Sequence, residues 1–367
     1  MTTPLADWNA STPATEQTTA DLDMPERSTM SELPFEPARL RLARELREWT
    51  QTDLAGRISV TAAALSQFES GVTKPSAETT AELSRVLDVP VAFFALPVAE
   101  THDGFFRSTR RTPIAHRRRA RAVAHIAHDL ATGVASKHVP AITVPHFPIA
   151  DLHARREDVE RVAAEVRRAW ALPNGPISNV VELLESHGIV VLRLPLDTAD
   201  VDAFSLPFAD RPVVVLGSDK NDRARSRFDG AHELGHLVMH GEQVWGMKEV
   251  EQQAHQFAAS FLMPADEIYH RLPQRADWPV LFDLKRQWQV SLAALLMRAR
   301  TLGRMTESSY LTAIKALSAR GWRRIEPVPL GSPEHPSLLK RIVGGQLGNN
   351  HCQALPRHVV NAIVSAN

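Results

Sequence analysis

Two histidines and a glutamate are spaced in this sequence like the parts of a hydrolytic metal site. His232, Glu233 and His236 form the pattern His-Glu-x-x-His. On an α-helix, residues four positions apart lie about 40° apart around the axis and roughly 6 Å along it, so both imidazoles can bind one divalent metal ion. Glu233 leans over the same face and can take a proton from a metal-bound water whose pKa the metal has lowered to about 7. The pattern therefore predicts the core of a zinc peptidase.

The same pattern also occurs by chance in ordinary amphipathic helices that carry no metal. Its surroundings favour the metal site. A short apolar run at 211–216 is typical of a buried strand, and 218–222 offers several helix N-cap residues. A strand, a turn and the helix with the motif are therefore expected in this order.

A third metal ligand is needed, because catalytic zinc usually takes three protein ligands and keeps a fourth position open for water. The segment 249–263 has helical spacing with an apolar stripe, and Pro264 ends it. Glu251 and His255 share a face beside that stripe. We prefer Glu251 as the ligand, because two histidines and a glutamate from a second helix form a recurrent hydrolytic set. His255 is then expected to support a ligand through a hydrogen bond.

His240 continues the spacing of four residues that relates His232 to His236. A metzincin places its third histidine ten residues after the first, beyond a glycine turn. Here the separation is eight residues and no turn intervenes. We therefore expect His240 to support a ligand or to lie exposed, and we do not expect it to bind the metal.

These motifs resemble the ImmA/IrrE-type family of regulatory metallopeptidases over about residues 178–300. The resemblance is carried by Ala-His-Glu-Leu-Gly-His-Leu and the downstream run Glu-x-x-Ala-x-x-Phe-Ala-x-x-Phe-Leu-Met-Pro. It implies that His232, His236 and Glu251 bind Zn²⁺, with Mn²⁺ as the alternative. It also implies that Glu233 is the general base. The position of His255 usually holds Asn or Asp in that family, so the resemblance leaves its role open.

Near the N-terminus, short helices are predicted at 40–49, 50–58 and 61–71, the last closed by a glycine. Together with Lys74-Pro-Ser and an apolar-periodic run at 81–89, they resemble an Xre/Cro-type helix-turn-helix domain over about sixty residues. The resemblance implies an all-α bundle that binds double-stranded DNA.

The same resemblance implies which residues meet the DNA. Gln51 is expected at a phosphate, and positions 62, 63 and 67 are expected at base edges in the major groove. Ala62 and Ala63 can touch a thymine methyl group but cannot hydrogen-bond a base. Gln67, with Ser66 beside it, is then the main polar reader. The expected contact set is Gln51, Thr61, Ala62, Ala63, Ser66, Gln67 and Lys74.

Between the two domains, the stretch 104–128 contains seven arginines and no acidic residue. Such a run can add phosphate contacts beside the helix-turn-helix and steepen the salt dependence of DNA binding. An equally weighted alternative is a solvated basic helix that packs through its apolar residues. The arginines are Arg107, Arg110, Arg111, Arg117, Arg118, Arg119 and Arg121, and the apolar residues are Ala120, Val123, Ile126 and Leu130.

The length of 367 residues and a hydrophobic content of 44% fit two or three domains. We expect a multidomain, mainly α protein, with a helix-turn-helix bundle and an α+β zincin-like metallopeptidase domain that contains a small sheet. The expected divisions are a disordered tail at 1–34, the helix-turn-helix domain at 35–98, a basic helical linker at 99–150, the metallopeptidase domain at 151–305 and a C-terminal helical extension at 306–367.

Composition and charge indicate the cellular location and the partners that we expect. A formal net charge of zero means that any nucleic-acid surface must come from local patches. Cys352 is the single cysteine, which excludes an intramolecular disulfide and fits a reducing cytosol. No apolar run approaches the roughly 20 residues of a transmembrane helix. We expect a cytoplasmic protein without a membrane partner, associated with the nucleoid when DNA-bound, and a homodimer because Xre-type domains often bind as dimers.

Two functions follow from these patterns. In the first, the protein is a zinc endopeptidase that cleaves a transcriptional repressor or a similar protein. In the second, it is an Xre-type transcription regulator whose metallopeptidase-like domain senses a metal, a ligand or a partner without cutting. Glu233 favours the first, because it is not a ligand and a sensing site would not need it. A third possibility is a toxin-antitoxin or prophage module.

Overall fold

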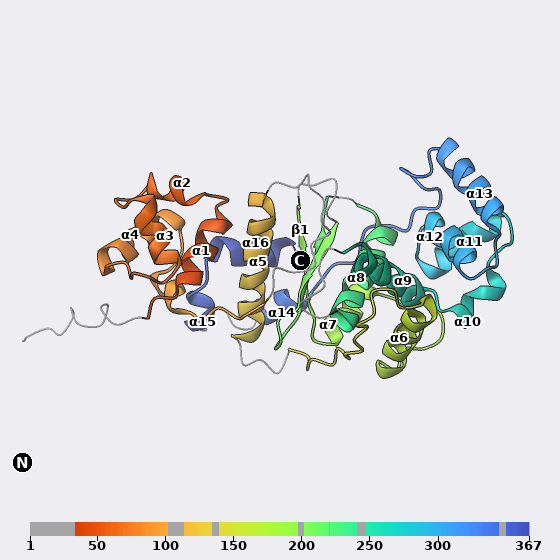
Figure 1. The fold of residues 1–367 in the computed structure, drawn as a ribbon, viewed down its shortest axis with the longest axis horizontal. Coiled ribbons are helices and arrows are strands. Elements are labelled where there is room, and N and C mark those ends of the chain that lie inside the picture. The colour runs from red at the N-terminus through yellow and green to blue at the C-terminus, as the bar shows by residue number, and fades with distance from the viewer. Residues whose placement is uncertain are drawn as a thin grey trace, which may run out of the picture. The chain divides into compact units, whose positions relative to one another are not determined.

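The computed structural model describes residues 34–101, 114–133, 139–196, 202–219, 221–240, 247–344 and 350–366. It confirms the predicted fold class, because the chain is mostly helical with a small three-stranded sheet, and a helix-turn-helix bundle precedes the sheet-containing domain (Figure 1). Residues 1–33 of the predicted tail, together with Arg107, Arg110 and Arg111, lie outside the described residues. Among the described residues, no helix is long and apolar enough to cross a membrane.

The helix-turn-helix bundle is built from short, capped helices around buried leucines. Thr50 and Asp53 form a capping box at the start of α2, and the Thr61 hydroxyl accepts a hydrogen bond from the backbone N–H of Ala64 at the start of α3. Both helices are shorter than the predicted segments 50–58 and 61–71. The elements are α1 (Pro37–Leu46), α2 (Gln51–Ala55), α3 (Ala62–Glu69), α4 (Ala77–Leu87) and the 3₁₀-helix η1 (Val91–Ala95).

The sheet has the strand order β1-β3-β2, with bounds β1 (Val190–Leu194), β2 (Ala203–Leu206) and β3 (Val213–Gly217). β1 runs parallel to β3, with Val190 opposite Val213. β2 runs antiparallel to β3, with Ser205 opposite Val214. β2 is therefore a terminal strand of this sheet.

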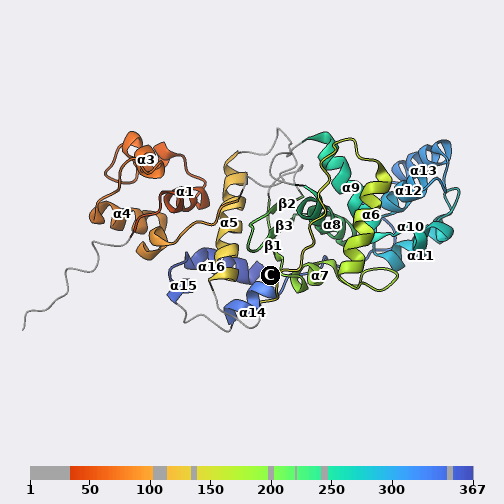
Figure 2. The ribbon, with the colours of Figure 1, turned by 60° about the horizontal axis from the view of Figure 1, so that its bottom comes forward.

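Both faces of the sheet are buried against helices (Figures 1 and 2). Val213 and Val215 point into a core that includes α5 (Ile114–Thr132), α14 (Leu338–Gly344) and α16 (Arg357–Ala366). Val214 and Leu216, on the opposite face, belong to a second core. That second core is formed with α6 (Arg156–Ala169), α7 (Val180–Ser186), α8 (Arg223–Met239) and α9 (Lys248–Leu262).

The second core continues through the helices that follow α9. Leu281, Trp288, Leu295 and Ala313 are all buried in it. The elements are α10 (Ala265–Ile268), the 3₁₀-helix η2 (Tyr269–Arg271), α11 (Trp278–Trp288), α12 (Leu292–Thr301) and α13 (Glu307–Ala319). The segment 306–367, predicted as one extension, thus divides its helices between the two cores, since α14, α15 (Asn350–Gln353) and α16 belong with the first.

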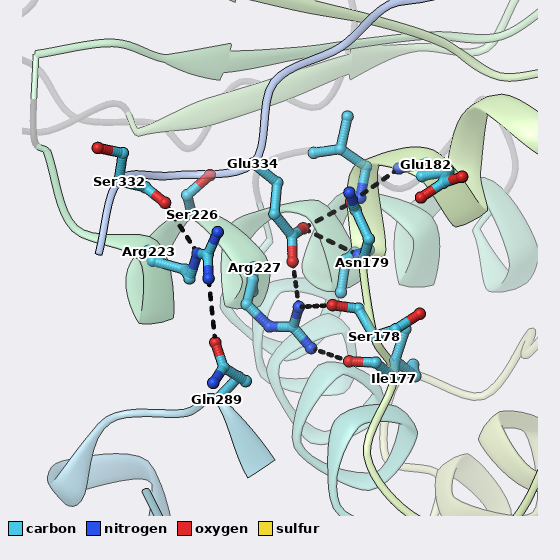
Figure 3. A network of polar contacts seen from close by, with 12 residues as sticks. Ile177, Ser178, Asn179, Glu182, Arg223, Ser226, Arg227, Gln289, Ser332 and Glu334 are labelled. Atoms are coloured by element: carbon cyan, nitrogen blue, oxygen red, sulfur yellow. Dashed lines mark hydrogen bonds and ion pairs between the residues drawn. The ribbon is translucent and has the colours of Figure 1, made fainter. Parts of the chain in front are cut away.

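A buried ion pair connects the chain beyond α13 to the helix that carries the histidine motif (Figure 3). Glu334 pairs with Arg227 of α8 and accepts hydrogen bonds from the backbone N–H groups of Val180 and Val181, at 2.8 and 3.2 Å. Arg227 also donates to the carbonyl of Ile177 at 2.6 Å. Because Arg227 and Glu334 are 1% and 5% exposed, removing either side chain would leave the other charge buried without its partner. The pair therefore holds the N-terminal half of α8 against the segment that contains Glu334.

Candidate metal site and DNA-binding surface

Helices α8 and α9 bring the three predicted metal ligands together. The Nε2 atoms of His232 and His236 are 3.1 Å apart. The Glu251 carboxylate lies 3.4 Å from Nε2 of His232 and 3.7 Å from Nε2 of His236. All three offer ligand atoms within 4.8 Å of one another, so this cluster could hold a metal ion.

The donor set fits a zinc ion in its chemistry. Two imidazole nitrogens and one carboxylate oxygen are the ligands of a recurrent class of catalytic zinc sites, which keep a further position for water. His232 and His236 are 7% and 0% exposed. Their nitrogen lone pairs and the Glu251 carboxylate therefore lie together with little water to screen their repulsion. Burial lowers the pKa of His236 well below its ordinary value, with the neighbouring imidazoles adding to the effect. A neutral His236 is the form that binds a metal.

A chain of hydrogen bonds determines which ring nitrogen of His236 carries the proton. The Gln253 side-chain N–H₂ donates to the carbonyls of Asp151 and Leu152, at 2.9 and 3.2 Å, so its Oε1 must face His240 as an acceptor. Nε2 of His240 then carries the proton, 3.0 Å from that oxygen. Nδ1 of His240 is left to accept from Nδ1 of His236 at 2.9 Å, which leaves a lone pair on Nε2 of His236 for the metal.

Glu233 lies beside the ligands and is held by a residue of the sheet. The Ser205 hydroxyl, on β2, donates to the Glu233 carboxylate at 2.6 Å. Glu233 is 3% exposed, and burial raises the pKa of its carboxyl well above the ordinary value, with the Glu251 and Asp229 carboxylates adding to the rise and the Ser205 hydrogen bond opposing it. The carboxyl is thus positioned to hold or release a proton next to the three ligand atoms.

The predicted DNA contacts lie on α2, α3 and the turns beside them. Thr61, Ala63, Ser66, Gln67 and Lys74 are exposed, while Gln51 and Ala62 are half-buried. The Gln51 side-chain amide donates to Glu69 at 2.9 Å, and Arg44 holds the same carboxylate at 2.6 and 2.8 Å. The Gln51 amide must therefore leave Glu69, or share its two N–H groups, to reach a phosphate.

Comparison with known protein families agrees with both regions. Residues 184–300 match the model of a peptidase family described as the IrrE N-terminal-like domain, and residues 40–94 match the helix-turn-helix model. Together, the two matches support an ImmA/IrrE-type protein with an N-terminal helix-turn-helix domain. No curated protein matched the sequence. The chain thus carries a metallopeptidase-like domain, and the helix-turn-helix domain supports DNA binding.

Two further histidines border the ligands of this IrrE-like domain. His240 is buried and contacts His236 and Gln253, so of the two expectations it fits support of a ligand and not exposure. The His255 ring packs edge-on against the His232 ring, with centroids 4.6 Å apart, and its Nδ1 lies 3.1 Å from the Glu251 carbonyl of its own helix. His255 thus borders His232 through its ring and Glu251 through the backbone.

His255 also lines a cavity of about 870 Å³ beside the site. The cavity lies among α6, α8, α9 and α12, with Phe228 and Asp229 on its wall. Its lining contains both acidic and basic side chains, among them Arg156, Glu160, Arg225 and Arg300. This large space opens on the His255 side of the ligand cluster.

Two residues of the site were missed by sequence reasoning. Ser205 lies 28 positions before Glu233 on a different element, and Gln253 lies 13 positions after His240. Ser205 had a weak signal, because it is a polar residue between apolar neighbours, whereas Gln253 lies among polar residues and had none. Buried polar side chains of this kind require partners, and the structure supplies them.

Proposed function

We propose that this ImmA/IrrE-type protein is a DNA-binding regulatory zinc endopeptidase that cleaves a transcriptional repressor or a similar protein. The observation that carries the proposal is Glu233. It is not one of the three candidate ligands, yet it is buried beside them and held there by Ser205. A site that only bound a metal would gain nothing from a second buried carboxylate with a raised pKa.

His232, His236 and Glu251 would hold the metal, Zn²⁺ or alternatively Mn²⁺. When bound, such an ion lowers the pKa of a water and polarises a peptide carbonyl. Glu233 takes a proton from the attacking water and passes it to the leaving amine nitrogen, so that one carboxyl acts first as base and then as acid. Ser205 keeps the carboxyl oriented, and Gln253 with His240 keeps His236 in the metal-binding tautomer.

The helix-turn-helix domain would bring the peptidase to DNA where its substrate is bound. The supporting observation is the exposed row of Ser66, Gln67 and Lys74 on and after α3, which is open to a major groove. We further propose a cytoplasmic protein, nucleoid-associated when bound, that acts as a homodimer on DNA.

A second candidate function is a non-proteolytic regulator whose metallopeptidase-like domain senses a metal, a ligand or a partner. The observation that favours it is the 870 Å³ cavity, which is within the size of small-molecule sites and has His255 on its wall. In this case the ligand cluster would stabilise the domain, and Glu233 would transfer no proton.

Replacement of Glu233 by Gln separates the two functions. Chains carrying Glu233→Gln, Glu182→Gln or no change are expressed in the native host, and new protein N-termini are compared by N-terminal labelling. Glu182 is exposed on α7 and controls for loss of one carboxylate. The peptidase proposal predicts N-termini that depend on Glu233 and fall by about 10²–10⁴-fold in Glu233→Gln, the usual range for a general base. Identical N-termini and identical gene regulation in all three chains would contradict it and favour the sensor.

A further inference from the structure

We infer that a cleft bordered by α1, α2 and the N-terminal half of α5 binds the phosphate backbone of DNA beside the recognition helix α3. This inference rests on the proposed DNA-binding function and extends it to the basic helix α5. The cleft has a volume of about 730 Å³ and includes Gln51, the residue expected at a phosphate. Its walls carry five arginines, Arg41, Arg44, Arg117, Arg118 and Arg121.

The cleft is positive although the whole chain is neutral. Two glutamates, Glu45 and Glu69, face the five arginines, which leaves three positive charges in excess. Glu69 is neutralised by the bidentate contact with Arg44. Glu45 is 6% exposed, and burial raises the pKa of its carboxyl despite the nearby arginines. The Glu45 carboxyl is therefore less readily ionised than an exposed one. The acidic groups therefore do not cancel the field of the cleft.

Among the described residues, two of the arginines form no close ion pair, although the charge of Arg41 acts on the Glu45 carboxylate at longer range. Within the ranges that the structure describes, neither Arg41 nor Arg117 forms an ion pair, and Nε of Arg117 is buried without a hydrogen-bond partner. Arg118 is 56% exposed and reaches Glu45 only at 3.9 Å. Guanidinium groups placed in this way are matched by phosphate oxygens, which accept two parallel N–H bonds from one arginine.

Packing turns the arginines of α5 toward the cleft. Ala120, Val123, Ile126 and Leu130 are buried against the core shared with the helix-turn-helix bundle. The opposite side of the first turns of α5 is left for the arginines. The two interpretations of the basic stretch are therefore compatible, because one side of the helix packs and the other can bind an anion.

The size and position of the cleft favour a polymer over a single phosphate. The arginines come from two helices and span about one turn of each, and the cleft reaches the α2 segment that precedes α3. A duplex whose major groove receives α3 places successive phosphates along such a surface. Double-stranded DNA is therefore the anion that this surface fits.

The salt dependence of binding tests the inference. The full chain is titrated with a fluorescent mixed-sequence duplex of about 20 base pairs at several KCl concentrations, since such binding is governed by phosphate contacts. Arg117→Ala/Arg118→Ala is compared with Arg161→Ala/Arg168→Ala, which removes two charges from exposed arginines of α6. The slope of log Kobs against log [KCl] is expected to become shallower by about 0.9 for each phosphate that is no longer neutralised, or about 2 in the α5 variant, and to stay at the wild-type value in the control.

An unchanged slope in the α5 variant, with wild-type protein binding the duplex, would overturn the inference and leave the proposed function intact. A wild-type protein that binds no duplex would overturn both. Poly-glutamate that displaces the duplex as well as an unlabelled duplex does would also overturn it, because the cleft would then take an acidic protein segment. Thermal unfolding of the variants at the wild-type temperature confirms that the comparison is between folded proteins.

Discussion

The candidate metal site and the helix-turn-helix surface of this protein use their polar residues in different ways. In the candidate metal site, ligand atoms from α8 and α9 converge within 4.8 Å, with both histidines buried and Glu251 half-buried. On the helix-turn-helix surface, Ser66, Gln67 and Lys74 lie exposed. The first is a site that the chain assembles by its own packing, whereas the second is completed only when DNA arrives.

This difference predicts how far from the replaced residue the effect of a substitution should extend. Removing one member of a buried polar network disturbs several hydrogen bonds, because the remaining partners are left unsatisfied in a place without water. An exposed side chain that meets DNA can be removed with little effect on the fold. Substitutions in the buried network should therefore affect the candidate metal ligands even from several hydrogen bonds away. Substitutions on α3 should affect only the DNA contact of the replaced residue.

Gln253→Leu tests the support of the metal site at its far end. Without the Gln253 amide, His240 loses the acceptor that fixes its proton, and His236 loses its preferred tautomer. Zinc affinity, measured by competition with a chromophoric chelator, should fall by about 10–100-fold, which is the usual effect of losing such a partner. The control variant Gln252→Leu, which replaces the exposed neighbouring residue, should retain the wild-type zinc affinity. Equal affinities in the two variants would show that this chain of hydrogen bonds does not act on the metal.

Gly235→Ala tests whether α8 and α9 must be in close contact. A Cβ at Gly235 would lie 2.9 Å from Cδ1 of the Phe257 ring, which is closer than carbon atoms approach. The free energy of unfolding in urea should fall by about 1–3 kcal/mol, the typical cost of overpacking a core. Gly230→Ala, on the same helix, meets its nearest atom at 3.5 Å and should be neutral or stabilising by up to about 1 kcal/mol. The reverse order of the two variants would be incompatible with this packing.

Much of the site could be predicted because it is local in sequence. The spacing of His232 and His236 is a property of one helix, and Glu251 follows on the next. Ser205 and Glu334 were beyond such reasoning, because each meets α8 only after the sheet and the C-terminal segment have folded back on it. The helix bounds at 50–58 were too long for a related reason: local pattern does not show where a cap ends a short helix.

Gln67→Ala tests the other side of the comparison. After the preferred operator has been selected from random duplexes, this variant should bind it about 1–3 kcal/mol more weakly, since the hydrogen bonds from Gln67 to a base are removed. Zinc content and unfolding should remain at wild-type values because Gln67 is exposed. Gln274→Ala, at another exposed glutamine, should change neither property. A loss of zinc in Gln67→Ala would show that the two regions are not as separate as the structure indicates.

The smallest expected effect concerns His125 of α5, which packs edge-on against Phe208 in the core shared by the helix-turn-helix bundle and the sheet. Burial lowers the pKa of His125 to about 3, with Arg121 adding to the effect. Between this value and an unfolded pKa near 6.5 the unfolded chain binds more protons, so the free energy of unfolding should fall as the pH drops through that window. His125→Leu should make this decline shallower. Parallel pH profiles for the two proteins would show that His125 is not buried in its neutral form.

The metal content of the purified protein tests the central claim most directly. Elemental analysis of the wild-type protein, of His232→Ala and of Glu233→Gln should give about one Zn²⁺ or Mn²⁺ per chain in the first and third, and none in the second, because His232 is a candidate ligand and Glu233 is not. A wild-type protein that takes up neither metal on reconstitution, or a His232→Ala variant that keeps a full equivalent, would contradict the claim that His232, His236 and Glu251 form a metal site.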